Sequence, residues 1–180
     1  MGSVASLQIL AHVLLPLSGV LYEFLGSFEM EIKMDNLDGG EVIALLEEHL
    51  SDMYATSPPE SVHALDVQAL KSSNITFFSA WFNGSIAGCI AIKNLDSQNA
   101  EIKSMRTSHN FRGQGVASEL LTFVLSFAKQ QGYKKISLET GTQEYFQPAH
   151  NLYKKFGFTE CGPFSDYKLD PNSQFMSRGV

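Results

Sequence analysis

The chain has 180 residues, of which 44% are hydrophobic and 18% charged, and this composition excludes a disordered or collagen-like protein and indicates one globular domain. The formal net charge of -6 argues against a surface that coats nucleic acid, because neutralising phosphates requires clustered Lys and Arg. The two cysteines, Cys89 and Cys161, have neither a CxxC nor a zinc-ligand spacing. We therefore expect reduced thiols, a cytoplasmic location and no metal.

The charge is unevenly distributed along the chain. Residues 1–100 carry 3 Lys and Arg against 12 Asp and Glu, whereas residues 101–180 carry 10 against 7. A basic half suits an anionic cofactor and an acidic half suits an amine substrate. An uneven but solvated surface would give the same pattern, so the charge alone does not decide between them.

Residues 1–29 form an apolar N-terminal extension, and residues 30–180 have the pattern of one soluble domain. From Val4 to Tyr22 the chain carries no formal charge, whereas a secretory signal begins with a positively charged stretch. Polar residues, Pro16 and Gly19 interrupt the stretch, which makes it a poor membrane span. We interpret the segment as an extension or a mis-set start, and membrane association is the least favoured alternative.

The first part of the domain predicts a strand, a helix with one apolar face and a shorter helix, over Met30–Met34, about Glu41–Tyr54 and Ser61–Leu70. Two runs rich in β-forming residues follow, over 75–82 and 85–93, with Asn83-Gly84 between them. Both turn residues tolerate positive φ, so this pattern predicts a hairpin.

The second part of the domain continues the alternation of strands and helices. It predicts, in chain order, a strand, a long helix, a strand, a helix and two short strands, over Ala100–Thr107, Gly115–Gln131, Lys134–Glu139, Pro148–Phe156, Phe158–Cys161 and Phe175–Ser177. Gly132 is expected to end the long helix.

The residues with the clearest chemistry lie in the turn from Arg112 to Ser118, between a strand and the long helix. A glycine-containing turn into a helix N-terminus exposes unpaired backbone N–H groups at the positive end of the helix dipole, and Arg112 adds a bidentate donor for phosphate oxygens. No Gly-Lys-Ser/Thr P-loop occurs, and a dinucleotide-binding turn would need a third glycine at Ser118. The turn alone indicates either a diphosphate site or a connection without a ligand.

Two stretches of the chain resemble the GNAT superfamily of acyl-CoA N-acyltransferases. Residues 100–117 (AEIKSMRTSHNFRGQGVA) resemble its acyl-CoA signature, with Arg112, Gly115 and Ala117 at the fixed positions of Q/R-x-x-G-x-G/A. Residues 149–158 (AHNLYKKFGF) resemble the family's A-x-x-L-Y-x-x-x-G-F at the expected separation.

The resemblance covers the chain from about Met30 onward and implies the GNAT fold. That fold is an α/β (α+β) domain with a central mixed, mostly antiparallel twisted sheet of about six or seven strands, one splayed strand pair and about four flanking helices. Three further stretches, 57–61, 138–141 and 170–173, look like those of a bacterial acetyltransferase subgroup.

The resemblance also implies that acetyl-CoA is the cosubstrate. In the family, backbone groups of the splayed strand, here near Met105, Arg106 and Thr107, hold the pantetheine arm and the carbonyl. The following turn wraps the pyrophosphate. The turn residues assigned in this way to cofactor binding are Arg112, Gly113, Gln114, Gly115, Val116, Ala117 and Ser118.

The resemblance places Tyr153 where a phenol protonates the leaving thiolate. A phenol with an ordinary pKa of about 10 can donate to a thiolate whose thiol has a pKa of about 8.5; the alternative is a core tyrosine. Glu101, near the start of the signature strand, is the first candidate for the general base, and a plain strand glutamate paired with Lys93 is the equal alternative. Glu139 is the rival base. The weaker candidates are His63 and His109.

The acceptor is expected between the first two helices and the splayed strands, where Glu60, His63 and Glu139 would bind it. Glu60, Glu101 and Glu139 would favour an amine, and Arg106 could hold a carboxylate, which suggests a small amino-acid-like or polyamine-like acceptor. We predict an acetyl-CoA-dependent N-acetyltransferase that uses direct transfer. The alternative is a non-catalytic acyl-CoA-binding sensor or regulatory module. A homodimer is an open expectation, since family members often dimerise.

Overall fold

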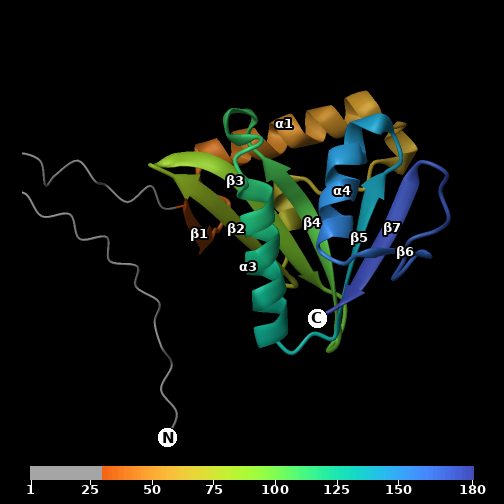
Figure 1. The fold of residues 1–180 in the computed structure, drawn as a ribbon. Coiled ribbons are helices and arrows are strands. Elements are labelled where there is room, and N and C mark those ends of the chain that lie inside the picture. The colour runs from red at the N-terminus through yellow and green to blue at the C-terminus, as the bar shows by residue number, and fades with distance from the viewer. Residues whose placement is uncertain (1–29) are drawn as a thin grey trace, which may run out of the picture.

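The computed structural model describes residues 30–180, and the predicted extension over residues 1–29 lies outside this part of the chain. A seven-stranded mixed sheet forms its centre, with the strand order β1-β2-β3-β4-β5-β7-β6 (Figure 1). The strands are β1 (Met30–Met34), β2 (Ile75–Phe82), β3 (Ser85–Asn94), β4 (Asn99–Thr107), β5 (Lys135–Gly141), β6 (Thr159–Cys161) and β7 (Ser173–Gly179). Among them, β4 and β5 pair in parallel and the other neighbours are antiparallel.

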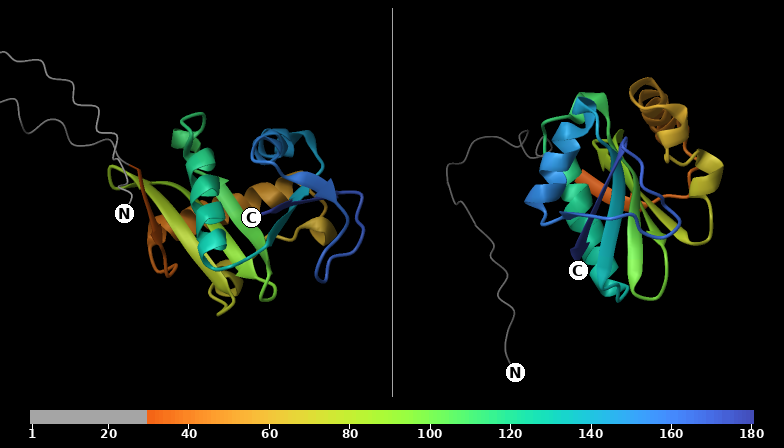
Figure 2. Two further views of the ribbon diagram at one scale, coloured as in Figure 1. Left: turned by 60° about the horizontal axis from the view of Figure 1, so that its bottom comes forward. Right: turned by 90° about the vertical axis from the view of Figure 1, so that its right-hand side faces the viewer.

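Helices cover both faces of this sheet (Figure 2). Those on one face are α1 (Gly40–Thr56) and α2 (Val67–Leu70), and those on the other are α3 (Val116–Gln130) and α4 (Gln147–Lys155). Each face has its own apolar core, one around Val42 and Leu46 of α1 and one around Leu120 and Val124 of α3. The predicted α/β fold with a mixed sheet and four helices is therefore confirmed. No helix of residues 30–180 has the length and apolar character to cross a membrane.

Local turn signals explain most of the element boundaries. Asn83 and Gly84 have φ values of 49° and 77°, so the predicted hairpin turn is present. The helix predicted over Ser61–Leu70 is wrong in its first half, because the chain has only a 3-10 turn over Pro59–Ser61 before α2. The Asp66 carboxylate accepts a hydrogen bond from the Ala69 backbone N–H at 2.8 Å and so fixes the start of α2. Residues 62–66 are consequently a loop.

The parallel strands β4 and β5 diverge after a short contact. Residues 99–102 pair with residues 135–138, and the ladder does not continue to the ends of the two strands. On its other edge β4 has a bulge, where Ser104 and Met105 face Ile90 and Ser104 has a left-handed φ of 50°. A bulge bends its strand and re-aims side chains. The predicted splayed pair is thus present and opens the sheet beside α1 and α4.

Candidate active site

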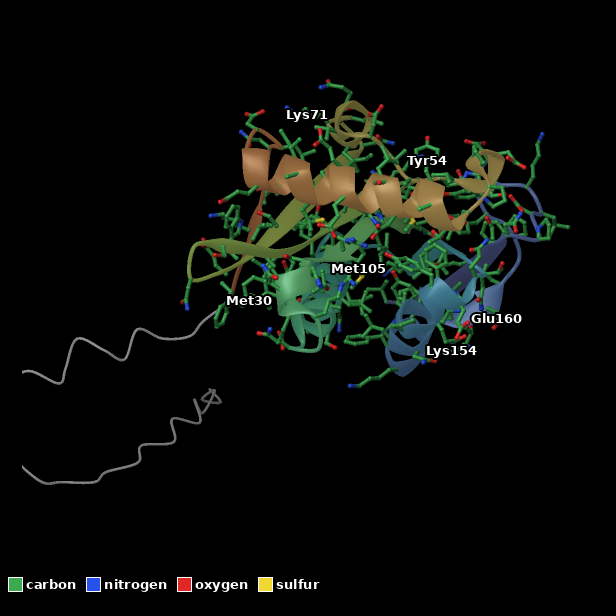
Figure 3. All side chains as sticks on the ribbon, turned by 90° about the horizontal axis from the view of Figure 1, so that it is seen from above. Met30, Tyr54, Lys71, Met105, Lys154 and Glu160 are labelled. Carbon is green, nitrogen blue, oxygen red and sulfur yellow. The ribbon has the colours of Figure 1, made fainter. Side chains whose placement is uncertain are left out.

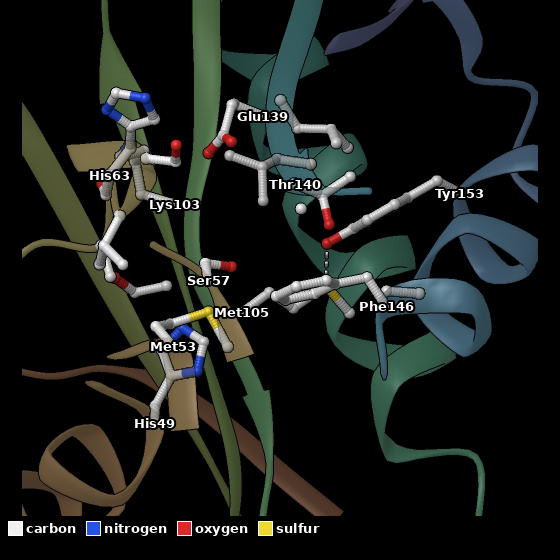
Figure 4. Close-up of a pocket in the computed structure, with 18 residues that line it drawn as sticks. His49, Met53, Ser57, His63, Lys103, Met105, Glu139, Thr140, Phe146 and Tyr153 are labelled. Carbon is white, nitrogen blue, oxygen red and sulfur yellow. Dashed lines mark hydrogen bonds between the residues drawn. The ribbon is translucent and has the colours of Figure 1, made fainter. Parts of the chain in front are cut away.

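A cavity of about 120 Å³, here called the inner cavity, lies where β4 and β5 separate (Figure 4). Its walls come from the end of α1, the loop after it, both splayed strands and the start of α4. The side chains that matter for its chemistry are His49, Met53, Ser57, His63, Lys103, Ser104, Met105, Glu139, Phe146 and Tyr153.

A second hollow of about 300 Å³, the outer groove, adjoins the inner cavity and shares His49, Met53, Met105, Phe146, Ala149 and Tyr153 with it. The outer groove continues toward the start of α3. Five of the predicted cofactor residues line it, namely Met105, Arg106, Thr107, Arg112 and Ala117. The two hollows form one passage from the α3 N-terminus to the opening between the strands.

The turn before α3 presents backbone amides without acceptors. Gly113 and Gly115 have φ values of 74° and 87°, which glycine adopts without steric cost. In the part of the chain described, the backbone N–H groups of residues 113–118 donate no hydrogen bond. The Val116 side chain is buried in the core, so only its backbone is open to a ligand. These amides and the α3 dipole, with Arg112 beside them, form a potential anion site.

Tyr153 extends from α4 into the inner cavity, where its hydroxyl points toward the Met105 sulfur at 3.7 Å (Figure 4). The side chain is only 8% exposed. Burial, together with the nearby charge of Glu139, raises the pKa of Tyr153 to about 12. The phenol is therefore protonated throughout the neutral range and can act as a proton donor.

Glu139 lies on β5 and faces the same cavity (Figure 4). Its carboxylate accepts a hydrogen bond from the Ser173 hydroxyl at 2.7 Å, and within residues 30–180 it has no ion pair. Burial raises the pKa of Glu139 above its ordinary value, against the opposing effects of Ser173, His63 and Lys103. A raised pKa suits a group that accepts a proton near neutral pH.

Glu101 has a different environment. It is 1% exposed, accepts a hydrogen bond from the Tyr167 hydroxyl at 2.6 Å, and lies 3.3 Å from the Lys103 amine. Lys93 is its cross-strand neighbour in register, but the ion pair forms with Lys103. Glu101 and Glu60 line a separate cavity of about 470 Å³.

The structure thus brings some of the predicted site residues together and leaves others apart. Tyr153, Glu139 and His63 line the inner cavity, whereas Glu60 and Glu101 do not. His63 also lines the separate cavity that contains Glu60 and Glu101. His109 is exposed and lines neither of them.

Arg106, predicted as a cofactor or carboxylate contact, joins β4 to α1. Its guanidinium donates to Glu48, to Asp52 at 2.6 Å and to the Tyr145 hydroxyl at 3.0 Å, and the residue is 7% exposed. These hydrogen bonds pair both terminal nitrogens of Arg106. Burial acts to raise the pKa of Asp52, but the hydrogen bonds from Tyr145 and Arg106 hold this pKa below its ordinary value.

Several cavity residues were not identified from the sequence as functional. His49 and Met53 fall on the apolar face of the α1 pattern, which is typical of core positions, yet both line the inner cavity and the outer groove. Burial, assisted by the charge of Arg106, lowers the pKa of His49 to about 4, so its imidazole is neutral at pH 7. A histidine on an apolar helix face was the available signal.

Comparisons with known proteins agree with this fold. The acetyltransferase (GNAT) family model matches residues 42–158. "Uncharacterized N-acetyltransferase YsnE" of Bacillus subtilis (strain 168) is 49% identical over 149 residues, which are 83% of this chain and 99% of that protein.

Solved structures show the same fold. An acetyltransferase from Streptococcus agalactiae 2603 aligns with a TM-score of 0.65 at 22% identity, over 84% of this chain and 98% of that one. A GNAT family acetyltransferase from Elizabethkingia anophelis, with acetyl-CoA bound, aligns with a TM-score of 0.62 at 20% identity over the same shares. The fold and the sequence together show that this protein is an acyl-transferring domain. The chain belongs to the acetyltransferase (GNAT) family, and the predicted enzyme class, N-acetyltransferase, is confirmed.

Proposed function

We propose that the protein transfers the acetyl group of acetyl-CoA directly to the amine of a small molecule. The observation that carries this proposal is the continuous passage from the free amides of the α3 turn, along the unpaired edge of β4, to Tyr153 and Glu139. A non-catalytic binding module would need the turn but not a proton donor and a proton acceptor facing one cavity.

The residues of the passage fit acetyl-CoA at both ends. The amides of residues 113–118 and Arg112 suit a pyrophosphate, because each N–H and the guanidinium can donate to a phosphate oxygen. The backbone of β4 beyond Ile102 has no partner on the β5 side, which leaves room for the extended pantetheine arm. The arm would then end at the inner cavity beside Met105.

Transfer from a thioester to an amine requires a neutral amine and a proton for the departing thiolate. We assign the first task to Glu139, directly or through one water, because it faces the cavity, has a raised pKa and carries no ion pair. Tyr153 takes the second task and returns a proton to the sulfur. Glu101, the first candidate from the sequence, instead positions Lys103 through an ion pair and does not contact the acceptor itself.

The inner cavity limits the size and the charge of the acceptor group that can react. At about 120 Å³ it admits a small reacting end, and Lys103 brings little net charge because Glu101 neutralises it. Glu139 lines the inner cavity and has no ion pair within residues 30–180, which favours an amine over an anion.

The proposal is tested by thiol release from acetyl-CoA with a panel of small amines, together with acetyl-CoA binding by calorimetry. We expect binding and amine-dependent release of free CoA. Binding without release for any amine would indicate a sensor module, and the absence of both would reject the proposal altogether.

A further inference from the structure

Three buried side-chain atoms lack hydrogen-bond partners in residues 30–180, and all three lie at the contact between α1 and β4. They are His49 Nδ1, Ser104 Oγ and Arg106 Nε. Ser104 and His49 line the inner cavity, and His49 and Arg106 line the outer groove. An unpaired buried polar atom costs roughly 1–3 kcal/mol, so these three atoms beside the two hollows call for a partner that the described part of the protein does not supply.

His49 is the member of this set that is best placed to meet a ligand. It comes from α1, and its ring lies beside Met53 at the edge of the inner cavity (Figure 4). Met105, which lines the same cavity, lies below α1 in the view from above (Figure 3). In the described chain neither ring nitrogen forms a hydrogen bond to the protein. A neutral imidazole offers one donor and one acceptor, and the described protein uses neither of them.

We propose that His49, with Ser104 and Arg106 Nε behind it, binds an uncharged hydrogen-bonding group of the acceptor, such as a carboxamide next to the reacting amine. This inference rests on the proposed function and names the substrate class of the same site. The acceptor then resembles an amino acid amide, including the end of a peptide, more closely than a free amino acid or a simple alkylamine.

The charges around the three atoms favour an uncharged group over a carboxylate. Arg106 supplies one positive charge, but Glu48 and Asp52 supply two negative charges at the same guanidinium. The low pKa of His49, about 4, means that it adds no positive charge at pH 7. A carboxylate would therefore meet net negative charge, whereas a carboxamide could pair with the free donors and acceptors without charge repulsion.

The test compares three matched acceptors in each of the alanine, leucine and phenylalanine series. These are the α-amide, the free amino acid and the amine that lacks the carbonyl group. Acetylation rates are measured at saturating acetyl-CoA and normalised to the concentration of neutral amine. For the native protein we expect kcat/KM for the amide to exceed that of both other compounds by about tenfold or more, the effect of one good hydrogen bond.

Two substitutions separate binding by His49 from a structural role. His49→Phe removes both hydrogen-bonding nitrogens, and we expect kcat/KM for the amide to fall to that for the alkylamine measured in the same variant. His49→Gln keeps a donor and an acceptor and should restore part of the advantage.

An equal loss for all three compounds in His49→Phe, or a native preference for the free amino acid or the alkylamine, would overturn the inference and leave the transferase function intact. Transfer to none of the compounds, despite acetyl-CoA binding, would reject the small-amine function and this inference with it.

Discussion

In the proposed mechanism, proton delivery to the sulfur depends on Tyr153. Removing its hydroxyl leaves the ring, which packs against Phe158 with 5.8 Å between ring centroids, so the core should be retained. We expect Tyr153→Phe to lower kcat by about 100-fold or more, because general acids typically contribute factors of about 10² to 10⁴. Acetyl-CoA affinity should change little, which steady-state rates and calorimetry would show.

Tyr133→Phe is the matched control, since Tyr133 is part of a distant hollow near β2 and β3. Its kcat should equal that of the native protein. An unchanged kcat in Tyr153→Phe would remove Tyr153 from the mechanism.

The two shifted acid–base groups also predict the pH profile of kcat/KM. Glu139 must be ionised to accept a proton, so activity should fall as pH drops through its raised pKa. Tyr153 must be protonated, and its pKa of about 12 predicts that kcat/KM does not fall with rising pH below pH 10.

We expect Glu139→Gln to lower kcat/KM strongly. After correction for amine ionisation, this variant should no longer show the loss of kcat/KM at low pH, here called the acidic limb. If Glu101→Gln keeps the acidic limb and Glu139→Gln loses it, the assignment of Glu139 as the base is confirmed. If Glu139→Gln keeps the limb and Glu101→Gln loses it, Glu101 is the base.

At the scale of elements, α3 contributes its N-terminus to the site, and the geometry of that end depends on Gly115. A β-branched residue at a φ of 87° is strained by about 1–3 kcal/mol and would turn the amides away. We expect Gly115→Val to raise the Kd for acetyl-CoA about tenfold or more in calorimetry.

Gly132 provides the control for this substitution, because it has a φ of 84° at the other end of α3. Gly132→Val should lower stability to a similar extent and leave the Kd unchanged. If both variants weaken binding equally, the turn is not the specific contact.

The pairing of α1 with β4 depends on Arg106, which joins Glu48, Asp52 and Tyr145. Arg106→Met should lower the free energy of unfolding by about 2 kcal/mol in urea titrations; a fully buried pair would cost more, but both carboxylates are partly exposed. Lys154→Met breaks an exposed 3.6 Å pair with Glu160 and should cost less than about 0.5 kcal/mol. Equal costs would show that the Arg106 cluster contributes no more than a surface pair.

At the scale of the whole molecule, the sequence predicts those features that depend on neighbouring residues. The Asn83-Gly84 hairpin, the α3 turn around Gly115 and the order of the elements all have local signals, and the structure contains them. Of the proposed catalytic residues, Tyr153 was identified from a family motif and Glu139 from its place near the end of β5.

The remaining features depend on contacts between distant segments. The bulge at Ser104 is a property of the β3–β4 register. The β4–β5 pairing ends at Ile102 and Leu138, so Glu101 lies inside the paired stretch, whereas Glu139 lies just beyond it and lines the inner cavity. His49 follows the apolar period of α1, and a histidine at such a position is only a weak local signal, because its place in the cavity wall depends on β4 across the interface. The loop over residues 62–66 was predicted as helix because the Asp66 cap was not recognised.

Acetyl-CoA binding to the α3 turn is most directly tested by thermal unfolding of the protein with and without this ligand. At about 100 times its Kd, acetyl-CoA should stabilise the native state by about 2.7 kcal/mol. For a domain of this size we expect Tm to rise by roughly 5–10 °C, and Gly115→Val should show a much smaller rise at the same concentration. An unchanged Tm for the native protein at millimolar acetyl-CoA would contradict the account.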